Sequence, residues 1–157
     1  MKRILFICTG NVCRSPMAEA LTKERIPAMW KDELEISSAG TYAWAGQPAS
    51  SLAIEVMQEQ GIDIGGHRAR ELSRELIEGA DVIFVMERAH RDEIERIAPE
   101  EVYKIVVMGE LDPKRSNPDI MDPIGGDRGT YMRTRDEIER LIFFTIDYIA
   151  DKFKLTK

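Results

Sequence analysis

Residues 4–16 read Ile4-Leu5-Phe6-Ile7-Cys8-Thr9-Gly10-Asn11-Val12-Cys13-Arg14-Ser15-Pro16, and the organisation of the chain follows from this stretch. The apolar run at its start is typical of a buried strand, and the glycine-containing segment after it is typical of a loop. We expect a helix to begin at its end, with Ser15 as the N-cap and Pro16 at the first helical position. The pattern therefore predicts a strand, a tight loop and the start of a helix.

Such a loop can bind an anion. Backbone N–H groups at a helix N-terminus point toward one place, and the helix dipole adds positive charge there. The same field favours the thiolate form of Cys8, which is the reactive form of cysteine. Arg14 adds a planar cation that can bind two oxygens of a phosphoryl group. The stretch therefore predicts a phosphoryl-transfer site in which nucleophile, cation and anion-binding loop are adjacent in sequence.

The rest of the chain alternates between strand-like and helix-like segments. We expect further strands at 34–38, 82–86 and 103–108, and helices at 17–25, 49–60, 73–79, 88–97 and 130–153. This alternation favours a parallel sheet with right-handed crossovers. The predicted fold class is α/β: a single flavodoxin-like domain over residues 1–157, with a four-stranded parallel sheet of order 2-1-3-4 and helices on both faces. That order places Cys8 where the strand order reverses, which is a common position for ligand sites.

The composition argues against several classes of protein. With 157 residues, 43% of them hydrophobic and 32% charged, the chain suits one globular domain with a single core. A net charge of −6 and a pI near 5.1 argue against a surface that binds nucleic acid or an anionic membrane. The N-terminal apolar run is shorter than that of a signal peptide, and no segment approaches the roughly 20 apolar residues of a membrane span. The two cysteines lie in one loop, as expected for free thiols in a reducing compartment, so we expect a cytoplasmic protein.

The pattern Cys-x5-Arg-Ser near the start of a small α/β chain resembles the signature of the low-molecular-weight protein tyrosine phosphatase family. Further matches lie at Ser38-Ala39-Gly40, at His67-Arg68-Ala69-Arg70 and at Asp122-Pro123. The resemblance implies hydrolysis of a phosphomonoester on a protein substrate, through a phosphocysteine intermediate and without a metal or organic cofactor. It implies Cys8 as nucleophile, Arg14 as the cation, and a phosphate-binding loop that includes Thr9, Gly10, Asn11, Val12, Cys13 and Ser15.

The same resemblance gives four polar residues a supporting role. In the family, an Asn and a Ser of the loop, a Ser after the second strand and a later His form a hydrogen-bond network that holds the loop open. The matching residues here are Asn11, Ser15, Ser38 and His67, and Ser15 is also placed to hydrogen-bond the thiolate. The other histidine, His90, lies in a charged segment, and we expect it to be solvated.

A leaving oxygen needs a proton, and a carboxylic acid on a loop can supply it. Two Asp-Pro pairs compete for this role, Asp112-Pro113 and Asp122-Pro123. The family's acid lies shortly before the last helix, which favours Asp122. We expect Asp112 to be a turn residue.

Two roles are open for Cys13. It can be a packed thiol, or it can form a disulfide with Cys8 that protects the nucleophile from peroxide, as the pairing does in the family. A zinc site is not expected, because no third and fourth ligands occur at suitable spacing.

The identity of the substrate is the least determined property. Trp44 occupies the position at which the family walls its substrate cleft, and Ile124 offers a smaller apolar surface. The segments 122–126 and 131–137 also resemble the protein arginine phosphatase branch of the family. That branch tends to carry Thr at the position of Val12, where tyrosine phosphatases tend to carry Ile. We expect phosphotyrosine as the substrate, with phosphoarginine as the alternative.

Three other functions fit part of the pattern. An arsenate reductase would need further cysteines, and none follows Cys13. A phosphocysteine carrier of a sugar-transport system would have less need of Arg14 and Asp122, and a non-catalytic phosphate-binding module would not need Cys8. The glycine patterns of nucleotide-binding loops do not follow the first strand.

Overall fold

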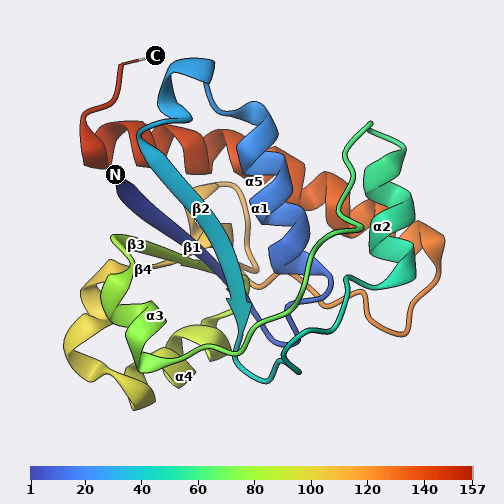
Figure 1. Ribbon diagram of the computed structural model, residues 1–157, viewed down its shortest axis with the longest axis horizontal. Helices are drawn as coiled ribbons and strands as arrows, with labels where there is room; N and C mark the ends of the chain where they lie inside the picture. Colours follow the sequence, from blue (N-terminus) through green and yellow to red (C-terminus); the bar gives the residue numbers. More distant parts are fainter. Residues whose placement is uncertain (157) are drawn as a thin grey trace.

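The computed structural model describes residues 1–156, in which helices cover both faces of a four-stranded parallel sheet (Figure 1). The strands are β1 (Lys2–Cys8), β2 (Leu34–Gly40), β3 (Val82–Val85) and β4 (Ile105–Val107), in the order β2-β1-β3-β4. The α-helices are α1 (Arg14–Arg25), α2 (Ser51–Gln58), α3 (Arg74–Gly79), α4 (Arg88–Ile97) and α5 (Arg128–Phe153). Short 3-10 helices cover Ala28–Trp30, Pro99–Lys104 and Met108–Leu111. The predicted α/β class, strand order and parallel pairing are confirmed.

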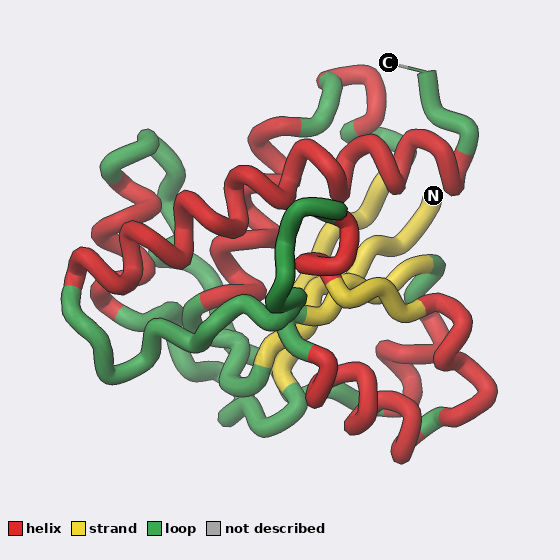
Figure 2. Tube along the Cα trace, turned by 180° about the vertical axis from the view of Figure 1, so that it is seen from behind, coloured by secondary structure: helices red, strands yellow, loops and turns green. Residues whose placement is uncertain are grey.

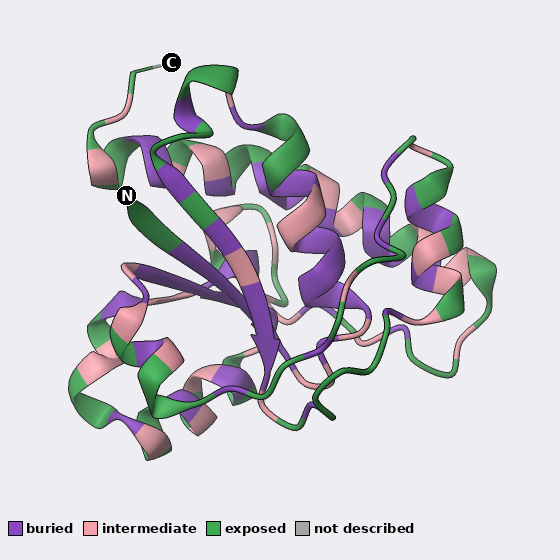
Figure 3. Ribbon diagram, in the orientation of Figure 1, coloured by how far each residue is buried: buried purple, intermediate pink, exposed green. Residues whose placement is uncertain are grey.

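The side-chain alternation of β1 divides the core between the two faces of the sheet. Ile4 and Phe6 belong to a buried cluster with α1, α2 and α5, whereas Leu5 and Ile7 belong to a second cluster with α3 and α4. Both faces of the central strands are therefore covered, which explains why β1 and β3 read as continuous apolar runs. Figure 3 shows the same burial along the central strands.

The carboxyl ends of the strands meet at one edge of the sheet, and loops gather beyond this edge (Figure 2). Cys8, the last residue of β1, lies in register with Gly40, the last residue of β2. Because β1 lies between β2 and β3, the chain leaves it at the point where the strand order reverses. The fold thus places Cys8 at the edge that the predicted strand order requires.

The start of α1 differs from the prediction. The helix begins at Arg14 with Cys13 at the N-cap, so Ser15 is not the N-cap and Pro16 lies at the third helical position. The Ser15 hydroxyl is bonded instead to side chains of Asn11 and Cys8. Pro16 is tolerated because N–H groups in the first turn of a helix have no intrahelical partner.

Other boundaries shift by a few residues. The fourth strand is shorter than the predicted 103–108, because Pro99–Lys104 forms a 3-10 helix in front of β4. The helix predicted at 49–60 is also shorter at both ends, whereas α4 matches the predicted 88–97. Among the described residues, no helix combines the length and the apolar character that a membrane crossing needs.

Candidate active site

Cys8 lies at the end of β1 with 2% of its surface exposed. Its Sγ atom is 2.9 Å from Oγ of Ser15. Asn11 Nδ2 donates a hydrogen bond to the same Ser15 oxygen at 2.8 Å, so the hydroxyl hydrogen of Ser15 is available to the sulfur. A hydrogen bond donated by Ser15 would stabilise a thiolate on Cys8.

Asn11 fixes the shape of the loop. Its φ angle of +56° is in the left-handed region, which asparagine adopts more readily than most residues. The backbone N–H of Arg70 donates to Asn11 Oδ1 at 3.0 Å, which fixes the orientation of the amide group. Nδ2 therefore faces the hydroxyl groups of Ser15 and Ser38, at 2.8 and 2.9 Å. His67 Nε2 donates to the Asn11 carbonyl oxygen at 2.7 Å, so all four residues expected in the network are joined.

Arg14 is buried, and the two edges of its guanidinium group have different surroundings. On one edge, Nη1 donates to Glu87 Oε2 at 2.5 Å and to the carbonyl oxygen of Ile120 at 2.6 Å. On the other edge, Nε has no hydrogen-bond partner among residues 1–156. Nη2 makes only long contacts there, at 3.4 Å to Thr9 Oγ1 and 3.5 Å to Asp122 Oδ2. This second edge is a fork of N–H donors suited to two oxygens of a phosphoryl group.

The two Asp-Pro pairs lie in different surroundings. Asp122 reaches the guanidinium group of Arg14, and its side chain is 35% exposed. Each aspartate accepts a hydrogen bond from the backbone N–H two residues on, at 2.9 Å from Lys114 for Asp112 and at 3.1 Å from Ile124 for Asp122. The contact with Arg14 is what distinguishes Asp122. Of the two aspartates, Asp122 is therefore the one placed beside the phosphate-binding loop.

The expectation that His90 is solvated is wrong, because only 3% of its surface is exposed. Glu87 is the N-cap of α4 and lies two residues after the end of β3, which places His90 in the first helical turn beside the sheet edge. The backbone N–H of Glu87 donates to His90 Nδ1 at 3.0 Å, and Nε2 lies 2.9 Å from Thr9 Oγ1. Burial, and secondarily the charge of Arg14, lowers the pKa of His90 to about 4.

Glu87 is a residue of the site that sequence analysis missed. Its carboxylate compensates the buried charge of Arg14, which would otherwise be costly to desolvate. One signal for it was present in the sequence. Glu87 lies just beyond the third strand, whose carboxyl end is adjacent to that of β1 in the predicted strand order.

Gly40 allows a close approach between β2 and the phosphate-binding loop. A Cβ atom at this position would overlap the carbonyl oxygen of Thr9 and lie 2.9 Å from the backbone nitrogen of Asn11. The residues after Gly40 are bonded to the loop, since Thr41 N–H donates to the Cys8 carbonyl oxygen at 3.0 Å. Only glycine fits at position 40, because any side chain would clash with the loop backbone.

Cys13 is a buried residue of the same loop, with Sγ 3.3 Å from Ser50 Oγ and 3.4 Å from the Tyr131 hydroxyl oxygen. Burial raises the pKa of the Cys13 thiol and is also the main reason that the pKa of Tyr131 is raised to about 12. Both cysteines are free. A disulfide between Cys8 and Cys13 under oxidising conditions stays a prediction.

The predicted cleft residues are exposed apolar side chains. Trp44 is 81% exposed and Ile124 is 57% exposed. The loop of Trp44 is anchored to the site, because Tyr42 N–H donates to the Thr9 carbonyl oxygen at 2.9 Å. Gly10 and Val12 are half-buried in the phosphate-binding loop.

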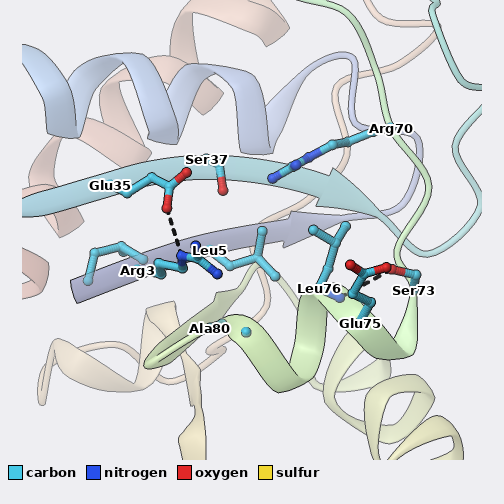
Figure 4. Close-up of a pocket in the computed structure, with 11 residues that line it drawn as sticks. Arg3, Leu5, Glu35, Ser37, Arg70, Ser73, Glu75, Leu76 and Ala80 are labelled. Atoms are coloured by element: carbon cyan, nitrogen blue, oxygen red, sulfur yellow. Dashed lines mark hydrogen bonds and ion pairs between the residues drawn. The ribbon is translucent and has the colours of Figure 1, made fainter. Parts of the chain in front are cut away.

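A groove lies beside the sheet, between β2 and α3, and Figure 4 shows the residues that line it. It contains an ion pair between Arg3 and Glu35 at 2.8 Å. Its lining includes none of the predicted catalytic residues. Among residues 1–156, no group of three or more His, Cys, Asp or Glu side chains is arranged to hold a metal ion.

Comparisons with known proteins agree with this geometry. Residues 3–150 match the family model described as low molecular weight phosphotyrosine protein phosphatase. The chain is 39% identical over 153 residues to a protein-arginine-phosphatase of Geobacillus stearothermophilus, covering 97% of this chain and 96% of that protein. It is 36% identical over 137 residues to the low molecular weight protein-tyrosine-phosphatase Wzb of Escherichia coli K12, covering 87% and 88%. The structure of a low molecular weight protein tyrosine phosphatase from T. tengcongensis superposes with a TM-score of 0.85 at 40% identity, covering 94% of this chain and 99% of that one. The chain therefore belongs to the low molecular weight phosphotyrosine protein phosphatase family, a family of phosphoric monoester hydrolases.

Proposed function

We propose that the protein hydrolyses phosphotyrosine on protein substrates, through a phosphocysteine intermediate formed on Cys8. The observation that supports this most directly is the buried Arg14 in the loop that begins at Cys8. One edge of its guanidinium group is anchored to the protein, and the other has a donor without a partner among residues 1–156. This arrangement suits the phosphoryl group of a monoester, which needs a fixed cation beside the nucleophile.

The chemistry assigns one role to each residue. The Cys8 sulfur attacks phosphorus and an S–P bond forms, while the bond from phosphorus to the tyrosine oxygen breaks and Asp122 gives that oxygen its proton. In the second step the Asp122 carboxylate takes a proton from water, the water oxygen attacks phosphorus, and the S–P bond breaks. Inorganic phosphate and the Cys8 thiolate result. Ser15 stabilises that thiolate through its hydroxyl group.

Phosphotyrosine as substrate is supported by the apolar residues around the loop. Trp44 and Ile124 are exposed, and the segment that carries Trp44 is hydrogen-bonded to the phosphate-binding loop. A planar ring could pack against such surfaces while its phosphoryl group lies on the loop.

Phosphoarginine is the second candidate. The segment after Asp122 has no aromatic residue at 123–126, and Gly125 has a φ of +80°. The likeness to the arginine phosphatase of Geobacillus stearothermophilus also extends over nearly the whole chain. We also infer a cytoplasmic setting, because a reducing compartment maintains free thiols such as Cys8 and Cys13.

The function is tested with phosphotyrosine and phosphoarginine peptides assayed side by side, with and without a chelator. Wild type should hydrolyse phosphotyrosine, and the chelator should have no effect. Cys8→Ser should lower kcat by more than about 10³-fold, because the nucleophile is lost. Arg14→Lys should lower it by about 10²–10³-fold, because a point charge replaces the fork.

Circular dichroism and urea unfolding provide the control for folding of both variants. Turnover by folded Cys8→Ser, or loss of wild-type activity with the chelator, would exclude the proposed mechanism. Efficient turnover of phosphoarginine alone would exclude phosphotyrosine as the substrate and support the second candidate.

A further inference from the structure

We propose that Thr9 binds the substrate directly, by donating a hydrogen bond from its hydroxyl group to an oxygen of the phosphoryl group. His90 is the positioning residue that orients this hydroxyl. The inference rests on the proposed phosphatase function, because it assumes that a phosphoryl group lies beside Cys8 and Arg14.

The tautomer of His90 follows from its contacts. A backbone N–H can only donate, so the bond from Glu87 N to His90 Nδ1, at 3.0 Å, leaves Nδ1 without a proton. The proton of the neutral ring is therefore on Nε2. The lowered pKa of His90 supports the neutral form at physiological pH. Nε2 then donates to Thr9 Oγ1, 2.9 Å away.

Thr9 Oγ1 thus accepts hydrogen bonds from two sides. His90 Nε2 donates from α4, and Arg14 Nη2 donates from the phosphate-binding loop at 3.4 Å. A hydroxyl oxygen has two acceptor positions and one hydrogen. With both positions used, the hydrogen of Thr9 must point away from His90 and Arg14. Among residues 1–156, no acceptor for this hydrogen is found.

The surroundings of Thr9 indicate which acceptor it serves. Thr9 directly follows Cys8, and its hydroxyl contacts Nη2, which belongs to the guanidinium edge suited to phosphate. Nη2 also contacts Asp122 Oδ2 at 3.5 Å, so the same guanidinium nitrogen lies between this hydroxyl and the proposed acid. A phosphoryl group bound there carries oxygens that only accept, and a polarised hydroxyl is a suitable donor.

The test compares variants that keep or remove the hydroxyl of Thr9. Thr9→Val has a similar shape without a hydroxyl, and Thr9→Ser keeps the hydroxyl. The readouts are the inhibition constant of inorganic phosphate, which has no leaving group, and kcat/KM for para-nitrophenyl phosphate. Because a hydrogen bond to a charged group is lost, Thr9→Val should raise the inhibition constant and lower kcat/KM by roughly tenfold to a hundredfold. Thr9→Ser should stay within about threefold of wild type, since its hydroxyl can make the same bond.

The role of His90 is tested by a double-mutant cycle. The carbonyl of asparagine in His90→Asn can still accept from the Glu87 N–H, but its side chain is too short to reach Thr9. His90→Asn should raise the phosphate inhibition constant severalfold in the wild-type background. It should have no effect in the Thr9→Val background, because it acts through the hydroxyl that this variant lacks.

Each outcome decides the inference. Thr9→Val with wild-type phosphate binding, or equal losses in Thr9→Ser and Thr9→Val, would overturn it. Additive effects in the cycle would overturn the role of His90. If Thr9→Val did not fold, Thr9→Ala would be compared with Thr9→Ser in its place. Turnover by Cys8→Ser would instead refute the proposed function, so failure of the function and failure of this inference are distinguishable.

Discussion

Replacing His90 by asparagine should remove a defined pH dependence from the stability of the protein. The buried ring resists protonation in the folded state, where its pKa is lowered to about 4, whereas the unfolded chain takes up the proton around the ordinary value of 6.5. The unfolded state therefore binds more protons between these two values. The contribution of His90 to stability is complete above about pH 6.5 and is lost as the pH falls toward about 4.

The size of the effect follows from the two pKa values. The step from 6.5 to about 4, at about 1.36 kcal/mol for each pKa unit, corresponds to about 3 kcal/mol over the whole range. About 2 kcal/mol of this should be lost between roughly pH 7.5 and pH 5. In His90→Asn this loss should be absent, because asparagine does not titrate.

The assay is urea unfolding of both proteins at the two pH values. Four charged residues act electrostatically on His90, and these are Arg14, Glu87, Asp119 and Asp122. All four are present in both proteins, so their own titration largely cancels in the comparison. The measured quantity is the change in unfolding free energy with pH in wild type minus the same change in the variant. Equal changes in the two proteins would refute the idea that His90 is buried in its neutral form.

Three further predictions concern the acid, the substrate and the packing of the loop. Asp122→Ala should slow phenyl phosphate hydrolysis by about 10²-fold or more and para-nitrophenyl phosphate hydrolysis less, because phenolate is the poorer leaving group and needs the proton. Asp112→Ala is the control, and a larger effect of Asp112→Ala than of Asp122→Ala would reverse the assignment of the acid. Val12→Thr should raise the ratio of kcat/KM for phosphoarginine peptides to kcat/KM for phosphotyrosine peptides by roughly threefold to tenfold, because the added hydroxyl can make one more hydrogen bond. An unchanged ratio would argue against a role of residue 12 in substrate preference. Gly40→Ala should lower the unfolding free energy by about 1–3 kcal/mol and reduce activity, because its methyl group would overlap the Thr9 carbonyl oxygen. Gly66→Ala is the control and should change neither the unfolding free energy nor the activity, since a Cβ there meets nothing within 4 Å. Equal unfolding curves for Gly40→Ala and Gly66→Ala would contradict the overlap expected at Gly40.

The fold could be predicted from the sequence because its signals are local. The apolar run of β1, the glycine-containing loop and the alternation of strand and helix segments specify a parallel sheet and place Cys8 at the switch point. The start of α1 was less predictable. The Ser15 hydroxyl could either cap a helix or bond to Cys8, and only the folded loop decides between these partners.

The surroundings of Arg14 could not be predicted in the same way. Glu87 and Ile120 reach it from segments far away in the sequence. His90 lies in a helix with many charged residues, so its pattern indicates a solvated side chain. The burial of His90 arises because α4 starts a few residues after β3 and next to the phosphate-binding loop. Long-range contacts of this kind carry no periodic signal along the chain.

The attachment of Ile120 limits how Asp122, the proposed catalytic acid, can move. Ile120 N–H donates to the carbonyl oxygen of Met86, the residue after the end of β3, and its own carbonyl oxygen accepts from Arg14. Both backbone groups of Ile120 are thus hydrogen-bonded, only two positions before Asp122. Insertions and deletions in the surface segment 112–118 would leave the chain length from Ile120 to the Asp122 carboxyl group unchanged. A single residue inserted between Ile120 and Asp122 would alter that length. Natural variation in chain length should therefore be tolerated in segment 112–118 and selected against between Ile120 and Asp122.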